Sequence, residues 1–350
     1  MSYLSSDYVQ CETIQNMLDE QFATCSVLSL DPMPALEAIL STQLANGISQ
    51  SVSDGSGKVK TVKVVYERRL LETDVTSSSG TRACSTSLES FDSYQTYEID
   101  PTVWLRAAEK FEVANLATVC TTDVQQMIAK KIGKVVDVLE RKIATQTASQ
   151  LAGMVGNWAS TVTGANASDE LELATLVSTA TKQLDPFMWG NLDIALQQTG
   201  YCQAPIIVGG SDFYKAARVY EAGCCSTTGA DIGTITNQYG KAVMYDKRVQ
   251  TALGNAADKS IVFQPGSVAL IYYNEAPQVA NLGANYAKFR VNSPRTGIPI
   301  DIVMQDNCGV ISVLGFANTK LVGLPTDMFS NTDEYVGVTY VNKIKVVNPA

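Results

Sequence analysis

The sequence predicts an α+β protein that combines an N-terminal arm, a long β-hairpin, one unusually long helix and a mixed α/β body. Three observations predict this fold class. Residues 58–69 alternate charged and β-branched side chains, residues 121–153 repeat apolar side chains every three or four positions, and short apolar runs separated by glycine and proline follow residue 200. A period of two is typical of strands and a period near 3.6 of amphipathic helices. We therefore expect the hairpin to precede the long helix and a mixed sheet to follow it.

The first 50 residues carry charge of a single sign. They hold six acidic side chains and neither Lys nor Arg. Apolar residues at helical spacing, from Ile14 to Phe22, indicate a short helix, and Pro32 and Pro34 force extended or turn backbone at the residues before them. The sequence thus predicts an arm over residues 1–50 that is not a domain of its own. The acidic residues are Asp7, Glu12, Asp19, Glu20, Asp31 and Glu37.

Residues 51–100 have the pattern of a projecting β-hairpin. A strand is expected from Lys58 to Arg69, a polar tip over residues 73–87, and a returning strand over residues 88–99. A two-stranded hairpin has too little partner surface to be stable alone in water. We therefore expect the hairpin to be stabilised by packing against another surface.

The strongest periodic signal lies between residues 121 and 153. Thr121, Thr122 and Asp123 offer N-cap side chains, and Gly153 marks the end. The apolar stripe consists of Val124, Ile128, Ile132, Val135, Leu139 and Ile143. A helix of about 30 residues is roughly 45 Å long, which is too long for one compact core to cover on every side. The charged residues between the apolar positions are typical of a solvated or interface face; they are Lys130, Lys131, Lys134, Asp137, Glu140, Arg141 and Lys142.

Another helix is expected to start at Ser168 and to stop at Asp185, which precedes a proline. Acidic residues follow Ser168 directly, as in a first helical turn, and Leu173 and Val177 share one stripe.

The rest of the second half is predicted as mixed α and β. A helix is expected over residues 191–198. A buried strand over residues 204–210 then leads through a tight turn into a helix capped by Ser211 or Asp212. Further strands are expected at residues 241–245, 260–263, 268–273, 287–291, 300–304, 310–316 and 336–346.

The composition excludes enzyme mechanisms that depend on histidine. The chain contains no histidine, so Ser-His-Asp and Cys-His triads, His-ligated zinc and imidazole acid/base chemistry are all excluded. Its eight cysteines include no C-x-x-C pair, and clustered spacing is what metal sites and disulfide frameworks need. We therefore assign no catalytic, cofactor-binding or metal-binding residue, and expect neither an enzyme nor a cofactor.

The net charge and the apolar pattern limit the kinds of partner that the chain is expected to bind. A net charge of −9 argues against sequence-independent DNA binding, which depends on Lys and Arg. No strongly apolar stretch is long enough to cross a membrane, so no membrane contact is expected. Charged residues make up 17% of the chain, against roughly 25% in soluble globular proteins. A surface covered by neighbouring subunits would explain this, and so would a soluble protein rich in Ser, Thr and Asn.

The order of arm, hairpin, long helix and mixed body resembles the major capsid proteins of tailed bacteriophages, the Hong Kong phage capsid fold. Residues 204–214, with Pro205-Ile206-Ile207-Val208-Gly209-Gly210, look like the strand and helix start of that family's axial domain. The segments similar to other parts of the family are residues 235–246, 260–273, 294–301 and 323–329. The likeness covers nearly the whole chain as architecture.

The resemblance implies a division of the chain. It implies an N-terminal arm (1–50), an extended β-hairpin loop (51–100), a peripheral domain with a spine helix (101–185), an axial α/β domain (186–275), and a return to the peripheral domain with C-terminal strands (276–350).

The resemblance also implies a function. The chain is expected to be a structural protein that self-assembles into hexamers and pentamers of an icosahedral shell around phage DNA, without sequence-specific contact to that DNA. It would assemble in the host cytoplasm and reside in the virion. Implied partners are copies of itself, a separate scaffolding protein, a portal and decoration proteins. We also expect no protease to trim the N-terminus.

The charge segregation suggests one inter-subunit contact. Acidic Asp19 and Glu20 of the arm are hypothesised to dock on a basic strand of a neighbouring subunit, which would guide register more than add affinity. The basic residues are Lys58, Lys60, Lys63, Arg68 and Arg69. The alternative, two independently solvated segments, stays open.

Two other functions stay open at this point. One is an encapsulin-like bacterial compartment, which shares this fold and encloses a cargo enzyme. The other is a carboxylate-dependent hydrolase, although no particular pair of carboxylates stands out in the sequence.

Overall fold

A computed structural model gives the fold of most of the chain. The residues that it describes are 11–23, 31–45, 48–53, 60–67, 92–115, 121–159, 162, 170–174, 176–178, 183–185, 187–201, 204–222, 234–236, 242–275, 281–282, 285–324 and 340–347.

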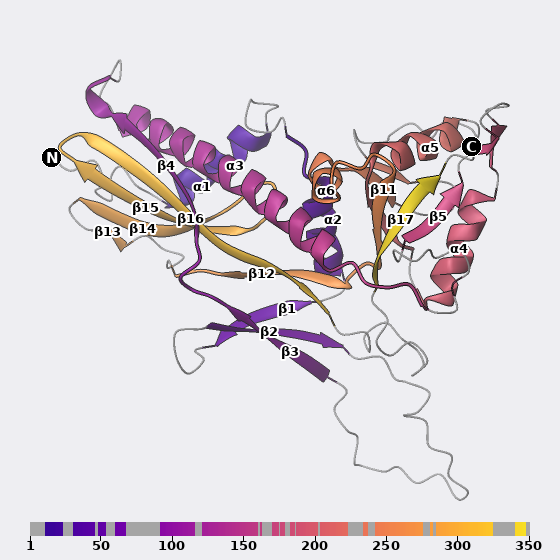
Figure 1. The fold of residues 1–350 in the computed structure, drawn as a ribbon. Coiled ribbons are helices and arrows are strands. Elements are labelled where there is room, and N and C mark those ends of the chain that lie inside the picture. The colour runs from indigo at the N-terminus through magenta and orange to yellow at the C-terminus, as the bar shows by residue number, and fades with distance from the viewer. Residues whose placement is uncertain are drawn as a thin grey trace, which may run out of the picture.

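The described chain contains both helices and strands, and its last part, after α6, is a run of strands (Figure 1). The helices are α1 (Cys11–Ala23), α2 (Pro34–Ala45), α3 (Thr121–Gly153), α4 (Met188–Gln198), α5 (Ser211–Ala222) and α6 (Lys247–Ala252), with a 3-10 turn, η3, at Val113–Asn115. The strands are β1 (Ser49–Ser53), β2 (Lys60–Glu67), β3 (Asp92–Ile99), β4 (Leu105–Glu112), β5 (Glu170–Ala174), β6 (Leu176–Ser178), β7 (Gln183–Leu184), β8 (Ile206–Gly209), β9 (Thr234–Thr236), β10 (Ala242–Tyr245), β11 (Lys259–Phe263), β12 (Val268–Tyr273), β13 (Asn281–Leu282), β14 (Tyr286–Asn292), β15 (Pro299–Asn307), β16 (Val310–Gly323) and β17 (Val341–Val347).

The first core lies between an antiparallel sheet and a layer of two helices. The strand order is β12-β16-β15-β14-β13, and β4 pairs with the first half of β16. Helix α3 packs on β16 and β4, while α1 packs on α3 and β14. The buried side chains of this core include Ile14, Leu18, Phe111, Ile128, Ile132, Phe289, Ile302 and Val313. On this face of the sheet, α3 therefore covers the side that ends in strand β4, and α1 lies on the other side of α3, over β14.

The second core surrounds a mixed sheet with the order β5-β17-β11-β8-β10-β9. Strand β8 is buried on both faces. Its Ile207 belongs to one cluster with Trp189 of α4 and Phe213 of α5, while Ile206 and Val208 belong to the cluster formed with α2 and the end of α3. A continuous apolar run is typical of such a doubly covered strand, and the predictions of this strand and of the helix at residue 211 are confirmed.

Helix α3 links the two cores, as Figure 1 shows. Its bounds and its buried stripe confirm the prediction: all six apolar positions are at most 2% exposed. Val124 to Leu139 lie in the first core, and Ile143 to Leu151 lie in the second. The helix is too long for one core, and two cores share it.

A third sheet, β1-β2-β3, stands beside β12. The predicted hairpin is present, because β2 and β3 pair antiparallel from Lys60↔Ile99 to Glu67↔Asp92. Two features explain its stability. Strand β1 adds a third strand, and Val62 and Val64 pack in one cluster with Ile271 of β12. The predicted tip and residues 68–91 lie outside the described residues.

The predicted helix from Ser168 to Asp185 is wrong. Residues 170–174 form β5, which pairs in parallel with β17. Leu171 and Leu173 are buried and Glu172 between them is exposed, so the true period is two. Glu170, whose position resembled a helical first turn, instead forms ion pairs with Lys343 (3.6 Å) of the adjacent strand β17 and with Lys259 (2.6 Å) of β11, the next strand along. Pairing with a distant strand overrode the local helical pattern.

An ionic clasp fixes the segment before α2 to α6. Asp31 Oδ2 lies 2.6 Å from Arg248 Nη2, and Asp31 Oδ1 lies 2.9 Å from Lys247 Nζ. Arg248 Nη1 also donates to the carbonyl of Pro32 at 2.9 Å. From the other side, Arg295 donates to the carbonyl of Asp31 at 3.0 Å and to Glu37 at 3.2 Å. The end of the arm is thereby attached to both sheets.

Candidate assembly surface along α3

The solvent face of α3 is basic. The exposed residues in its middle are Gln126, Lys130, Lys134, Val138, Arg141, Lys142, Thr145 and Ser149. Among the α3 side chains that the structure describes, every exposed charged one is therefore Lys or Arg. Asp137 and Glu140, the acidic residues of the same stretch, are buried.

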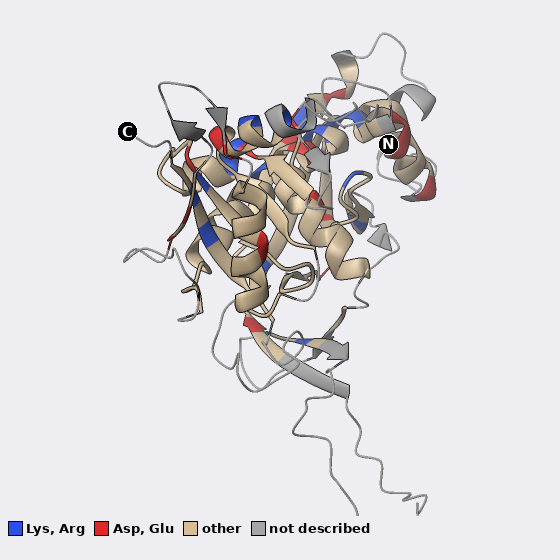
Figure 2. Ribbon diagram, turned by 90° about the vertical axis from the view of Figure 1, so that its right-hand side faces the viewer, with Lys and Arg blue, Asp and Glu red and all other residues tan. Residues whose placement is uncertain are grey.

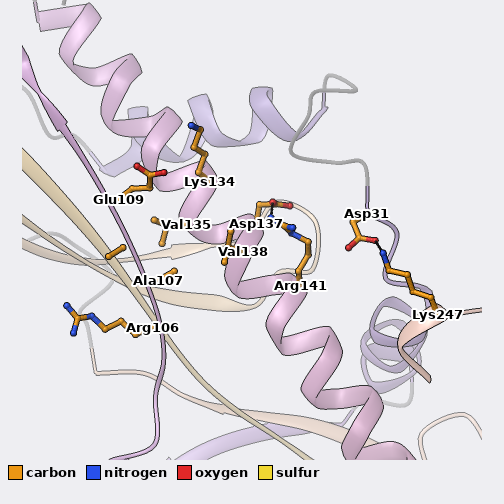
Figure 3. Close-up of a pocket in the computed structure, with 11 residues that line it drawn as sticks. Asp31, Arg106, Ala107, Glu109, Lys134, Val135, Asp137, Val138, Arg141 and Lys247 are labelled. Carbon is orange, nitrogen blue, oxygen red and sulfur yellow. Dashed lines mark hydrogen bonds and ion pairs between the residues drawn. The ribbon is translucent and has the colours of Figure 1, made fainter. Parts of the chain in front are cut away.

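A groove of about 750 Å³ runs beside this face, between α3 and the edge strand β4 (Figure 3). Ala107, Ala108 and Val135 contribute its apolar lining, together with Val138, which is 49% exposed. The charged residues around it are Asp31, Arg106, Glu109, Lys134, Asp137, Arg141 and Lys247. The cations on either side of this exposed valine favour contact with an acidic partner.

Each carboxylate around the groove already has a cation. Glu109 pairs with Lys131 at 3.0 Å, and Asp137 pairs with Arg141 at 2.7 Å. The hydrogen bond from Lys131 lowers the pKa of Glu109, whereas burial raises the pKa of Asp137 against the attraction of Arg141. For Asp31, burial works in the raising direction, but the hydrogen bond from Lys247 and the charge of Arg248 leave its pKa lowered.

Two further cations add positive charge at the groove. Lys134 is exposed, and the guanidinium of Arg106 lies 6.0 Å from the ring centroid of Phe316. With the carboxylates neutralised by their partners, the rim presents net positive charge to a ligand. Paired carboxylates are also poorly suited to the general acid and base roles of a hydrolase.

A buried carboxyl group lies behind the groove. Ser293 Oγ and Thr296 Oγ1 both donate to Glu140 Oε1, the second at 2.6 Å. Oε2 of Glu140 is buried and has no hydrogen-bond partner among the described residues. Burial raises the pKa of Glu140, although these hydrogen bonds and the charge of Arg295 oppose the shift. This group ties α3 to the loop between β14 and β15.

Glu140→Gln is expected to gain stability relative to the unchanged protein as pH rises. A carboxyl whose folded pKa is raised contributes stability that is complete below the ordinary value of 4.5 and is lost as pH rises through the folded pKa. A glutamine side chain has nearly the same shape but does not ionise, so its contribution to stability does not fall as pH rises. Melting temperatures of both proteins between pH 4 and pH 8 measure the effect. A difference that stays constant over this range would contradict the role of Glu140.

The structure places the sequence-predicted contact residues on separate clusters. Asp19 and Glu20 are exposed on α1, which packs in the first core. Lys60 and Lys63 are half-buried on β2, whose apolar side chains pack against β12. Lys58, Arg68 and Arg69 lie outside the described residues. Within one chain the acidic residues of α1 and the lysines of β2 therefore do not meet. Their contact between subunits stays a prediction.

Sequence reasoning missed the groove. The basic stripe of α3 was recognised as a solvated or interface face, and its exposure agrees with that. The other wall, β4, was not predicted. Its inward side chains, Leu105, Ala107, Glu109 and Phe111, do alternate with exposed ones, and this was the one available signal.

Other chemistry is sparse in the described part of the chain. Within those ranges, no three Cys, Asp or Glu side chains gather as a metal-binding group. No described helix is both long and apolar enough to cross a membrane. Cys308 is a free, exposed cysteine in the turn between β15 and β16.

Comparison with known proteins gives matches to solved structures alone. No protein-family model matches the chain, and no curated protein matches it. The chain is similar to the capsid of Ralstonia phage GP4, with 9% identity, a TM-score of 0.40, and coverage of 86% of this chain and 87% of that one. It is also similar to the head structure of Helicobacter pylori bacteriophage KHP40, with 8% identity, a TM-score of 0.39, and coverage of 84% and 85%. The capsid of cyanophage P-SCSP1u matches with 10% identity, a TM-score of 0.36, and coverage of 85% and 86%.

Proposed function

We propose that the chain is a structural subunit that self-assembles into the closed shell of a phage capsid. The observation that carries the proposal is the β1-β2-β3 sheet, which stands outside the two larger sheets (Figure 1). One face of it buries Val62, Val64 and Ile99, while Thr96 and Glu98 of β3 are exposed. A sheet of this kind, attached to an elongated body with two cores, offers surfaces that neighbouring copies can cover.

The proposal assigns a role to each segment. Residues 1–50 are the N-terminal arm, and 51–100 are the extended loop that lies on a neighbour. Residues 101–185 and 276–350 are assigned to a peripheral domain around α3, and 186–275 to an axial domain around β8 and α5. Three strands cross these boundaries, because β5 and β17 pair within the sheet of β8 and β12 pairs with β16. Hexamers and pentamers, a scaffolding protein and a portal belong to the same proposal. The sparse charge of the chain, 17%, supports it because covered surfaces need few charges.

Sedimentation of the purified protein tests this function. We expect particles that sediment many times faster than a single 37.6 kDa chain and that enclose nucleic acid when isolated from infected cells. A shell that instead co-purifies with one host enzyme would indicate a cargo compartment. A monomer that stays monomeric at high concentration would contradict the proposal.

A further inference from the structure

Helix α1 presents an acidic face to solvent. Its exposed residues are Glu12, Asn16, Asp19 and Glu20, which share one side of the helix at spacings of four, three and one. Ile14 and Leu18 on the opposite side are fully buried against the first core. The arm itself contributes neither Lys nor Arg. Figure 2 shows the acidic positions in red on the helix nearest the N-terminus.

The acidic face and the basic groove lie on opposite flanks of one layer. Helix α3 packs on β4 at one edge of the first sheet, and α1 packs on α3 and on β14, farther from that edge. Gln15 of α1 exchanges hydrogen bonds with the backbone of Asn292 at the end of β14, at 3.0 and 3.2 Å. The groove opens on the β4 side of α3. Two copies placed side by side in this layer can therefore bring α1 of one against the groove of the next.

We propose that α1 of one copy docks on the basic face of α3, along the groove beside β4, in a neighbouring copy. This inference rests on the proposed function, because it needs many copies in one assembly. The charges match in spacing as well as in sign. Glu12 and Asp19 are seven residues apart on α1, as Lys134 and Arg141 are on α3, which is roughly 10.5 Å on each helix. Arg141 pairs with Asp137, but its side chain is still 43% exposed. Val138 lies between the two cations and is open to contact.

The contact is head to tail, since different surfaces of the two copies meet. Contacts of this type build rings when the rotation between copies closes, and open chains when it does not. A ring of copies linked through α1 and α3 is the unit from which a closed shell can be made. The acidic face guides the copies into register and speeds their encounter.

The lysines of β2 are less suitable partners for α1. Lys60 and Lys63 are half-buried, whereas Lys130 and Lys134 on α3 are exposed. The α3 face also has a groove and an exposed valine beside its cations. The two possibilities make opposite predictions for charge reversal.

Charge reversal in both helices tests the contact. One variant carries Lys130→Glu and Lys134→Glu, and the other carries Glu12→Lys and Asp19→Lys. Each alone is expected to slow assembly on the order of tenfold, as followed by light scattering at low salt. A single chain that carries all four substitutions is expected to restore assembly, because its basic α1 then meets an acidic α3 at every contact, in rings of five as well as of six. A matched control, Lys215→Glu with Arg218→Glu on α5, changes the charge equally and is expected to assemble normally.

The outcomes separate this inference from the proposed function. If the unaltered chain forms no large particles, both are overturned. If it assembles and the α1 and α3 variants keep its rate, or if the chain with all four substitutions fails to restore assembly, only the contact is overturned. Loss of assembly confined to Lys60→Glu with Lys63→Glu would overturn it as well and would favour β2. The neutral pairs, Lys130→Gln with Lys134→Gln and Glu12→Gln with Asp19→Asn, guard against misfolding, and each is expected to weaken the salt dependence of assembly.

Discussion

Gly315→Val is expected to destabilise the folded protein by about 3 kcal/mol, the upper part of the range for overpacked cores. Gly315 lies on β16 directly beneath α3. A Cβ atom there would overlap Val135 Cγ1 and would come within 2.9 Å of Leu139 Cδ1. Both residues belong to the stripe that buries α3 in the first core. A larger side chain must therefore lift the helix from the sheet or force its neighbours out of their rotamers.

A matched control lies on the same strand. Gly323 ends β16, and a Cβ atom there meets nothing within 4 Å. Gly323→Val is expected to change stability by less than about 0.5 kcal/mol, as surface substitutions do. Urea unfolding of the two variants measures the difference. Val135→Ala is expected to recover part of the loss in Gly315→Val, because it removes the overlapping methyl groups. Equal losses in the two glycine variants would show that α3 does not pack as closely as described.

Arg248→Met is expected to cost about 2–3 kcal/mol, the range for lost hydrogen bonds to charged groups. The Arg248 side chain is 6% exposed and bonds to Asp31 and to the carbonyl of Pro32. Methionine fills a similar volume but leaves the half-buried carboxylate of Asp31 with its exposed partner alone. The segment before α2 then loses its attachment to α6.

Lys247→Met is the control for the clasp, because Lys247 pairs with the same carboxylate but is 63% exposed. Exposed ion pairs contribute at most about 1 kcal/mol, so this variant is expected to lose little. Thermal unfolding of both proteins at neutral pH measures the difference. If the two substitutions cost the same, burial of Arg248 is not what makes the clasp strong.

Elements with a strong local period could be predicted from the sequence. Helix α3 was found with its ends, because its stripe is unbroken and its caps are explicit. The β2–β3 hairpin and the turn from β8 into α5 were found for the same reason. The start of α4 was placed three residues late, since Phe187 at its N-cap makes no side-chain capping bond.

Elements that depend on distant partners could not be predicted. Strand β5 looked helical because its pairing partner, β17, lies about 170 residues away in the chain. Helix α2 was missed because its prolines suggested a turn, whereas Pro34 is its first residue, where proline is well tolerated. Strand β16 was predicted only as far as residue 316. It continues to Gly323 because it exchanges its partners β15 and β4 for β12 along the way.

The candidate site also has one part that the sequence predicts and another that it does not. The basic character of α3 could be read from the spacing of Lys130, Lys134 and Arg141, because a helical face follows from sequence alone. The groove could not, since its second wall is an edge strand with alanine and charged residues that have low strand propensity. The position of α1 on the opposite flank depends on its contacts with β14, about 275 residues away.

Electron microscopy of the purified protein tests the central claim most directly. A shell subunit is expected to appear as closed particles of uniform diameter, with rings of subunits visible on their surface. The same preparation of the Lys130→Glu, Lys134→Glu variant is expected to show fewer closed particles. A field of small single particles from the unaltered chain, at the concentration where assembly is expected, would contradict the claim that this protein builds a shell.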